Sequence, residues 1–334
     1  MTQTAPPLLR VLDLFCGIGS FTWAALRYPT VFVAVSGLDN DREVAQTYSN
    51  TYGLASLWGN IQEFDCTHPD FQKYEADVVT AGFPCQPFSG AGHRAGFLDT
   101  TNGDLIFYTA EIVKKMKPAY VVLENVTGVL TLDGGETHTT ITNLFIDAGY
   151  QITWVTMNAK ECGIPQDRKR AFAFCQRRDT AVSQCCVLGI LKRILEDRKS
   201  IPLPSLSDFL GIPPLEAVIS HTVRIGGFHT HIDHPRNWTE YRFQGTQDVY
   251  KLTLTDCAKL QGFEENKIMW ADTMSTTGKR KAIGNSIPTV LTCVMMELVA
   301  GVEHIRQQNR GWGFSPTMCT GCKFDPLPHS PQPQ

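Results

Sequence analysis

The first half of the chain alternates short apolar runs with longer stretches of helical spacing. Runs of strand length, rich in β-branched residues, lie at 9–15, 31–38, 77–81 and 119–123. Stretches of helical spacing lie between them, and the clearest one spans 105–116. Strands with continuous apolar runs are typically buried on both faces. The alternation therefore predicts an α/β protein with a doubly wound, mostly parallel sheet.

The pattern changes after residue 175. A helical stretch at 185–198 is followed by four prolines between 202 and 214, and then by a segment at 221–247 that is rich in glycine, histidine and aromatic residues. This region predicts either a small second domain or a long loop-rich insertion. Helical spacing then returns, and 288–302 reads as a strongly apolar helix that begins at a proline.

Composition places the chain among ordinary globular proteins. Of its 334 residues, 43% are hydrophobic and 19% are charged. No apolar stretch approaches the roughly 20 residues that a bilayer requires, and the N-terminus lacks a secretory pattern, so we expect an intracellular protein without membrane spans. The 11 cysteines are then expected to be reduced thiols.

The formal net charge of -3 excludes a protein coated in positive charge, but it does not exclude a local nucleic-acid site. Between Lys160 and Lys199 there are ten basic and five acidic residues, which predicts a basic patch suited to phosphates. For residues 192–199, a solvated helix face explains the charges equally well.

Residues with useful chemistry follow the predicted strands, and ligands of open α/β sheets bind beyond the carboxyl ends of the strands. Gly17 and Gly19 form a Gly-x-Gly turn after the first strand, and Asp39 follows the second. Such a turn admits a ligand close to the backbone, and such an acid can bind ribose hydroxyls. Ser20 follows Gly19, so the third glycine of the dinucleotide motif is absent. The pattern favours an uncharged nucleoside cofactor over a pyrophosphate; a tight turn without a ligand is the alternative.

Two further strands deliver a thiol and a carboxylate to the same edge. Cys85 lies between Pro84 and Pro87, which stiffen its loop, and Glu124 ends the fourth strand. The alternative for Cys85 is a buried thiol that acts only as a small hydrophobe. A partly desolvated carboxylate has a raised pKa and can donate a proton. The two residues therefore suggest a nucleophile and an acid beside a nucleoside cofactor.

Six segments, in their order along the chain, resemble the motifs of the cytosine carbon-5 DNA methyltransferases. They are DLFCGIGSFTWAAL, GFPCQPFSGAG, LENVTGVL, CGIPQDRKRAFAF, LTDCAKLQGF and AIGNSIPTVL. The resemblance implies a Rossmann-like, S-adenosylmethionine-dependent methyltransferase with a small loop-rich target-recognition domain. It implies a catalytic domain at 8–175 plus 272–305, a recognition domain at 176–271 and a flexible tail at 311–334.

The resemblance also implies a mechanism, because carbon 5 of cytosine is too weak a nucleophile to take a methyl group directly. The Cys85 thiolate would add to carbon 6, Glu124 would protonate N3, and Arg168 and Arg170 would hold the base edge and the cysteine loop. The methyl donor would be S-adenosylmethionine, and the substrate would be duplex DNA whose target base is flipped out. We expect a monomer, located in the nucleus of a eukaryote or the cytoplasm of a bacterium.

The family's binding residues can be carried over by position. Those that match its cofactor site are Phe15, Gly17, Ile18, Gly19, Ser20, Asp39, Asn40, Asn60, Ile61, Asn285 and Ser286. Those expected to contact DNA are Gln86, Ser89, Arg224, Arg236 and Arg242. The family usually has an aspartate where Asn60 stands, so the adenine amino group would here meet an uncharged acceptor.

Two other functions stay open on the sequence. One is an RNA enzyme, since a branch of the same family methylates transfer RNA, although its Cys-Phe-Thr triplet is absent here. The other is a catalytically silent regulator, against which the intact Cys85 and Glu124 count. A histidine cluster at 221–234 and a Cys-x-x-Cys pair at 319–322 lack the four-ligand pattern of a zinc site, so we expect no metal.

Overall fold

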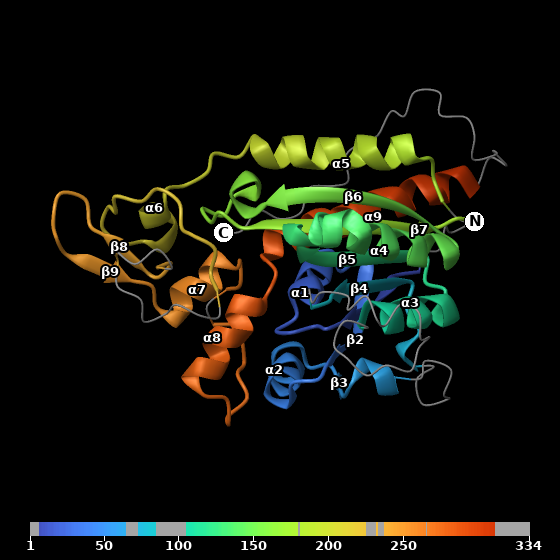
Figure 1. Ribbon diagram of the computed structural model, residues 1–334, viewed down its shortest axis with the longest axis horizontal. Coiled ribbons are helices and arrows are strands. Elements are labelled where there is room, and N and C mark those ends of the chain that lie inside the picture. Colours follow the sequence, from blue (N-terminus) through green and yellow to red (C-terminus); the bar gives the residue numbers. More distant parts are fainter. Residues whose placement is uncertain are drawn as a thin grey trace.

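The computed structural model describes residues 7–64, 73–84, 105–179, 181–224, 232, 237–264 and 266–310. These residues form a seven-stranded sheet with the order β3-β2-β1-β4-β5-β7-β6 (Figure 1). Its strands are β1 (Leu9–Leu14), β2 (Phe32–Asp39), β3 (Ser56–Trp58), β4 (Val78–Gly82), β5 (Tyr120–Val126), β6 (Tyr150–Asn158) and β7 (Lys169–Arg177).

Five strands, from β3 to β5 in the sheet order, run parallel, and β7 is antiparallel to both of its neighbours. The predicted doubly wound, mostly parallel sheet is therefore confirmed. The four apolar runs correspond to β1, β2, β4 and β5, whereas β3, β6 and β7 had not been predicted. Strand β6 lies at an edge and keeps several half-exposed positions, so its sequence lacks a continuous apolar run.

Helices cover both faces of the sheet. Along β5, Tyr120 and Val122 belong to the core that also contains residues of α1 (Ser20–Leu26), α5 (Gln184–Lys199) and α9 (Thr289–Arg310). Val121 and Leu123, which alternate with them, belong to the core shared with α3 (Leu105–Met116) and α4 (Glu136–Asp147). Helix α2 (Arg42–Tyr52) lies beside β2 and β3. Alternate side chains of one strand thus build two separate cores.

Helix α5 packs with the sheet rather than with the loop-rich region. Its residues Val187, Ile190 and Leu191 are buried in the same core as residues of α9. Figure 1 shows α5 lying along the sheet layer, apart from the loop-rich region. The sequence had placed this helix in the proposed small domain at 176–271. Its apolar side chains lie against the sheet layer, so the loop-rich part of the chain follows α5.

The region after α5, from Leu206 to Asn285 and called the small region below, builds a third core. It contains α6 (Leu206–Leu210), β8 (Glu240–Arg242), β9 (Val249–Lys251), α7 (Leu254–Leu260) and α8 (Thr276–Asn285). Trp238, Tyr241 and Leu252 from this region pack in one cluster with Ile18, which lies in the turn after β1. This region therefore lies against the carboxyl end of β1.

Membrane-spanning character is weak in the described part of the chain. No single helix there is long and apolar enough to cross a bilayer. Helices α8 and α9 meet that criterion only when taken together, across a 42° bend. The apolar residues of α9 are buried in the core of the sheet layer.

Candidate active site

The turn between β1 and α1 has an unusual backbone. Phe15, Gly17 and Gly19 have positive φ angles of 55°, 54° and 85°. Glycine tolerates this region, whereas a phenylalanine there is strained, and such strain is common at functional sites. A Cβ added to Gly19 would lie 2.3 Å from the ring of Tyr52, but one added to Gly17 would meet nothing within 4 Å. Packing therefore requires Gly19, and open space lies beside Gly17.

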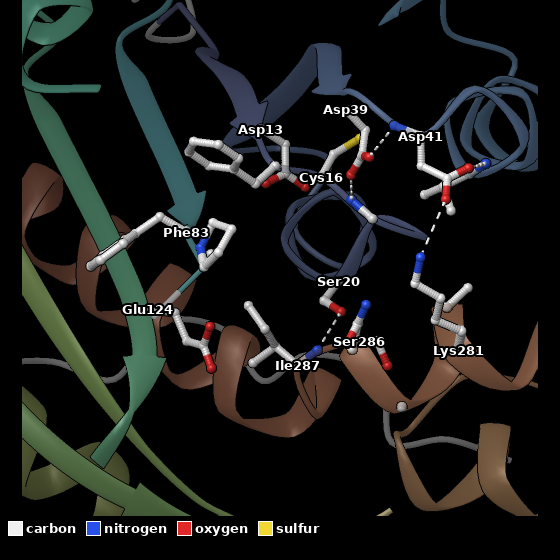
Figure 2. Close-up of a pocket in the computed structure, with 18 of the residues that line it drawn as sticks. Asp13, Cys16, Ser20, Asp39, Asp41, Phe83, Glu124, Lys281, Ser286 and Ile287 are labelled. Atoms are coloured by element: carbon white, nitrogen blue, oxygen red, sulfur yellow. Dashed lines mark hydrogen bonds and ion pairs between the residues drawn. The ribbon is translucent and has the colours of Figure 1, made fainter. Parts of the chain in front are cut away.

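Asp39, at the end of β2, organises the same turn. Its carboxylate accepts the N–H of Gly17 at 2.9 Å and that of Asp41 at 2.9 Å (Figure 2). Burial raises the pKa of this carboxyl group, although the backbone hydrogen bonds act against the rise. Each carboxylate oxygen has more than one acceptor site, so Asp39 can still bind hydroxyl groups of a ligand.

Asp13 lies beneath this turn and was not predicted as a site residue. It is 2% exposed, and it accepts hydrogen bonds from the hydroxyls of Thr80 at 2.8 Å and Thr22 at 3.3 Å. Burial raises the pKa of Asp13 to about 7. An acid inside an otherwise apolar strand is rare, and that position was the sequence signal that could have identified it.

Glu124, near the carboxyl end of β5, pairs with Arg170 of the neighbouring β7. Arg170 Nε lies 3.0 Å from Glu124 Oε1, and the two side chains are only 13% and 9% exposed. Burial raises the pKa of Glu124, while the guanidinium groups of Arg170 and Arg168 act in the opposite direction. A desolvated carboxyl group with a raised pKa is suited to proton transfer.

The end of β4 is held close to this pair. A Cβ on Gly82 would lie 3.3 Å from Glu124 Oε2, so glycine permits the close approach. Asn125 Nδ2 donates to the carbonyl of Phe83 at 3.0 Å. These contacts fix the chain immediately before Cys85. The predicted residues Cys85, Gln86, Ser89 and Arg236 lie outside the described residues.

Arg168 differs from Arg170 in its contacts. It is 2% exposed, and its Nη1 donates to the carbonyl of Val223 at 2.5 Å. Its Nη2 donates to the carbonyls of Gly284 and Ser286 at 3.0 and 2.8 Å. Arg168 therefore joins Val223 to the C-terminal end of α8, while Arg170 contacts the glutamate.

These groups surround one cavity of about 410 Å³, a volume typical of small-molecule sites. Ser20 closes one side of it by accepting the N–H of Ile287 at 3.2 Å (Figure 2). The predicted residues that line the cavity are Phe15, Gly17, Ser20, Asp39, Asn40, Glu124, Arg168, Arg170, Asn285 and Ser286. The cavity thus brings the predicted cofactor side and the predicted acid together.

Other predicted residues lie elsewhere. Ile18 is buried in the third core, and Gly19 packs closely against the ring of Tyr52. Asn60 caps a short 3₁₀ turn at Ile61–Glu63, and neither Asn60 nor Ile61 is among the lining residues. The predicted DNA contacts Arg224 and Arg242 are also outside the described lining of the cavity.

Asp41 and Lys281 line the cavity and were not predicted. Lys281 Nζ lies 3.9 Å from Asp41 Oδ2, which links α8 to the start of α2 (Figure 2). Asp41 also caps α2 by accepting the N–H groups of Glu43 and Val44. An Asp before a helix is a normal cap in sequence, so only the tertiary structure reveals its second contact.

The charge excess at 160–199 does not form one surface facing the cavity. Four of its basic residues have acidic partners other than Glu124, namely Lys160 with Asp167, Arg177 with Asp179, Lys192 with Glu196 and Arg198 with Glu297. Arg168 is buried and Arg170 pairs with Glu124. Six of the ten basic residues thus form ion pairs or hydrogen bonds, and the basic patch that the sequence predicts stays a prediction.

The metal-ligating side chains of the described residues are dispersed. No group of three or more His, Cys, Asp or Glu residues is placed there to hold a metal ion. Cys16, Cys162, Cys175, Cys185, Cys186, Cys257 and Cys293 are free thiols. Most of the predicted histidine cluster and the Cys-x-x-Cys pair lie outside the described residues.

Known proteins resemble this chain in sequence. The family described as C-5 cytosine-specific DNA methylase matches residues 9–211. Type II methyltransferase M.NgoBI of Neisseria gonorrhoeae is 30% identical over 298 residues, which cover 84% of this chain and 89% of that protein. Type II methyltransferase M.BanI of Aneurinibacillus aneurinilyticus is 34% identical over 168 residues, which cover 49% of this chain and only 37% of that relative's length.

The fold has a solved counterpart. The crystal structure of S. pombe Dnmt2 methyltransferase aligns with a TM-score of 0.69 at 16% identity, over 87% of this chain and 98% of that one. The fold is therefore that of an α/β methyltransferase. The chain belongs to the C-5 cytosine-specific DNA methylase family, which confirms the resemblance seen in the sequence. This family uses S-adenosylmethionine as the methyl donor.

Proposed function

We propose that this protein is a DNA (cytosine-5-)-methyltransferase that acts as an intracellular monomer on duplex DNA. It transfers a methyl group from S-adenosylmethionine to carbon 5 of a flipped-out cytosine. The observation that carries the proposal is the buried pair of Glu124 and Arg170, which shares one cavity with Phe15 and Asp39.

The cavity residues fit the methyl donor. Asp39 keeps acceptor sites for ribose hydroxyls, and the open space beside Gly17 admits a ligand close to the backbone. Asn285 and Ser286 form the opposite wall. Bound in this cavity, S-adenosylmethionine would supply the methyl group for carbon 5.

The protein's own groups activate the cytosine. The Cys85 thiolate adds to carbon 6, and N3 takes the proton of Glu124, so that carbon 5 becomes the nucleophilic end of an enamine. The raised pKa of Glu124 keeps a proton available, and Arg170 fixes the orientation of the carboxyl group. After methylation, a base takes the carbon-5 proton and the bond between carbon 6 and sulfur breaks, which restores the thiolate. N3 returns its proton to the Glu124 carboxylate.

The substrate is tested by incubating the purified protein with tritium-labelled S-adenosylmethionine and either duplex DNA or total transfer RNA. We expect label in DNA, at cytosines that bisulfite sequencing identifies. Label confined to transfer RNA would replace DNA by RNA as the substrate. A protein that binds the cofactor but labels neither polynucleotide would support the regulatory alternative.

The mechanism is tested with two variants. Cys85→Ser should abolish methyl transfer, and Glu124→Gln should reduce the rate by a factor of about 10² to 10⁴, which is typical for loss of a general acid. Both variants should still bind S-adenosylmethionine in a calorimetric titration. Full activity of Cys85→Ser would rule out the covalent route.

A further inference from the structure

A segment of the small region is paired with the chain that leads into β7. Residues 220–223 run alongside residues 165–168. The Ser220 N–H donates to the carbonyl of Pro165 at 2.7 Å, and the Asp167 N–H donates to the carbonyl of Ser220 at 2.9 Å. These bonds place a loop-rich segment in a defined register with the chain that leads into β7.

Two buried side chains complete this register by holding the backbone of Val223. Gln166 Oε1 accepts the Val223 N–H at 3.1 Å, and Arg168 Nη1 donates to the Val223 carbonyl at 2.5 Å. Gln166 Nε2 also donates to the carbonyl of Leu260 at 2.6 Å. Gln166 is fully buried, and Arg168 is 2% exposed. The N–H and the carbonyl of Val223 are thus both held by side chains from the segment that leads into β7.

The two segments that these hydrogen bonds join lead to residues with different proposed roles. After Arg168 the strand continues to Arg170, which pairs with Glu124. After the buried Val223 comes the exposed Arg224. Arg224 is therefore connected to the Glu124–Arg170 pair through a few hydrogen-bonded residues.

We propose that Gln166 is a positioning residue for polynucleotide binding. Together with Arg168 it fixes Val223, so that Arg224 meets the phosphate backbone at a set position relative to the Glu124–Arg170 pair. Contacts to phosphate position a nucleic acid without reading its sequence, which is the role that a fixed arginine supports. This inference rests on the proposed DNA methyltransferase function.

The chain contains a matched control at the other end of β7. Gln176 is 2% exposed, and it holds the backbone of Val182 in the same manner. Its Nε2 donates to the Val182 carbonyl at 2.9 Å, and its Oε1 accepts the Val182 N–H at 3.1 Å. Gln176 and Val182 are not among the residues that line the cavity.

The test compares Gln166→Met with Gln176→Met, because methionine keeps the length of the side chain and removes both polar groups. Both variants should melt at a lower temperature. Only Gln166→Met should raise KM for duplex DNA, by about tenfold, as expected for the loss of one well-placed hydrogen bond. KM for S-adenosylmethionine should stay unchanged, and amide hydrogen exchange at Val223 should accelerate only in this variant.

An equal rise of KM for DNA in Gln166→Met and Gln176→Met would overturn the inference, because general destabilisation would explain both. A wild type that methylates no DNA would instead refute the proposed function.

Discussion

Two buried carboxyl groups line the same cavity in different surroundings. Glu124 faces the guanidinium of Arg170, whereas the hydrogen bonds to Asp13 come from the hydroxyls of Thr80 and Thr22. Burial raises the pKa of both groups, and for Asp13 it reaches about 7. Glu124 therefore has a cationic partner, whereas the side chains that donate to Asp13 are neutral. We expect Asp13 to affect the stability of the protein more than the rate of methyl transfer.

Asp13 makes the free energy of unfolding depend on pH. Its pKa of about 7 in the folded protein exceeds the value near 3.9 of an unfolded chain, so the folded state binds the proton more tightly. The resulting stability is fully present below about pH 4 and is lost as the pH rises through 7. Asp13→Asn should remove this loss, which amounts to about 2 kcal/mol between pH 5.5 and 8, as measured by urea unfolding.

Asp147→Asn, at an exposed position of α4, controls for the removal of a carboxyl group. If Asp13→Asn keeps the wild-type slope of unfolding free energy against pH, the Asp13 carboxyl is not the group that titrates.

At the scale of elements, the burial of a strand determines whether its sequence alone predicts it. Strands β1, β4 and β5 are buried on both faces, so their sequences are continuous apolar runs. Strand β7 begins with Lys169 and Arg170, whose charges are typical of a surface segment. Arg170 is nevertheless nearly buried because Glu124 faces it from the adjacent strand. Glu124 lies on a different strand, so the sequence around Arg170 does not reveal its partner.

The start of α1 depends on one glycine. Gly19→Ala places a methyl group 2.3 Å from Tyr52 in addition to the strain of a positive φ, so we expect a loss of about 2–5 kcal/mol in unfolding free energy. The turn that carries the Gly17 N–H would shift with it. The affinity for S-adenosylmethionine, measured by calorimetry, should therefore fall as well.

Gly53→Ala is the matched control, because Gly53 also has a positive φ but open space beside it. This variant should lose only about 1–2 kcal/mol, the cost of the backbone conformation. Equal losses in the two variants would mean that Tyr52 moves aside without cost.

In the whole molecule, α5 is attached to the sheet layer by an ion pair as well as by apolar packing. Arg198 of α5 pairs with Glu297 of α9, and Tyr28 donates a hydrogen bond to the same carboxylate. The described lining of the cavity contains no residue of α5. The domain division inferred from the sequence stays a prediction, and we now propose that the recognition region begins after α5.

Arg198→Ala should therefore lower stability without changing the chemistry. We expect a loss of about 1–3 kcal/mol, less than for a fully buried pair because the two side chains are 24% and 17% exposed. Lys192→Ala breaks an exposed pair on the same helix and should cost at most about 0.5 kcal/mol. Urea unfolding measures both losses, and kcat should match the wild type. A large fall of kcat in Arg198→Ala would place α5 in the catalytic machinery.

Periodicity was sufficient to predict the parallel core, the six motifs were sufficient for the family resemblance, and the strand ends were sufficient to place Glu124 at the cavity, because each depends on neighbours in the chain or on one strand. The folded chain was needed to separate the role of Arg168 from that of Arg170, to bring Asp13 and Lys281 to the cavity and to attach α5 to the sheet. These features depend on contacts between residues far apart in sequence. Their burial and charge balance arise only when the elements pack together.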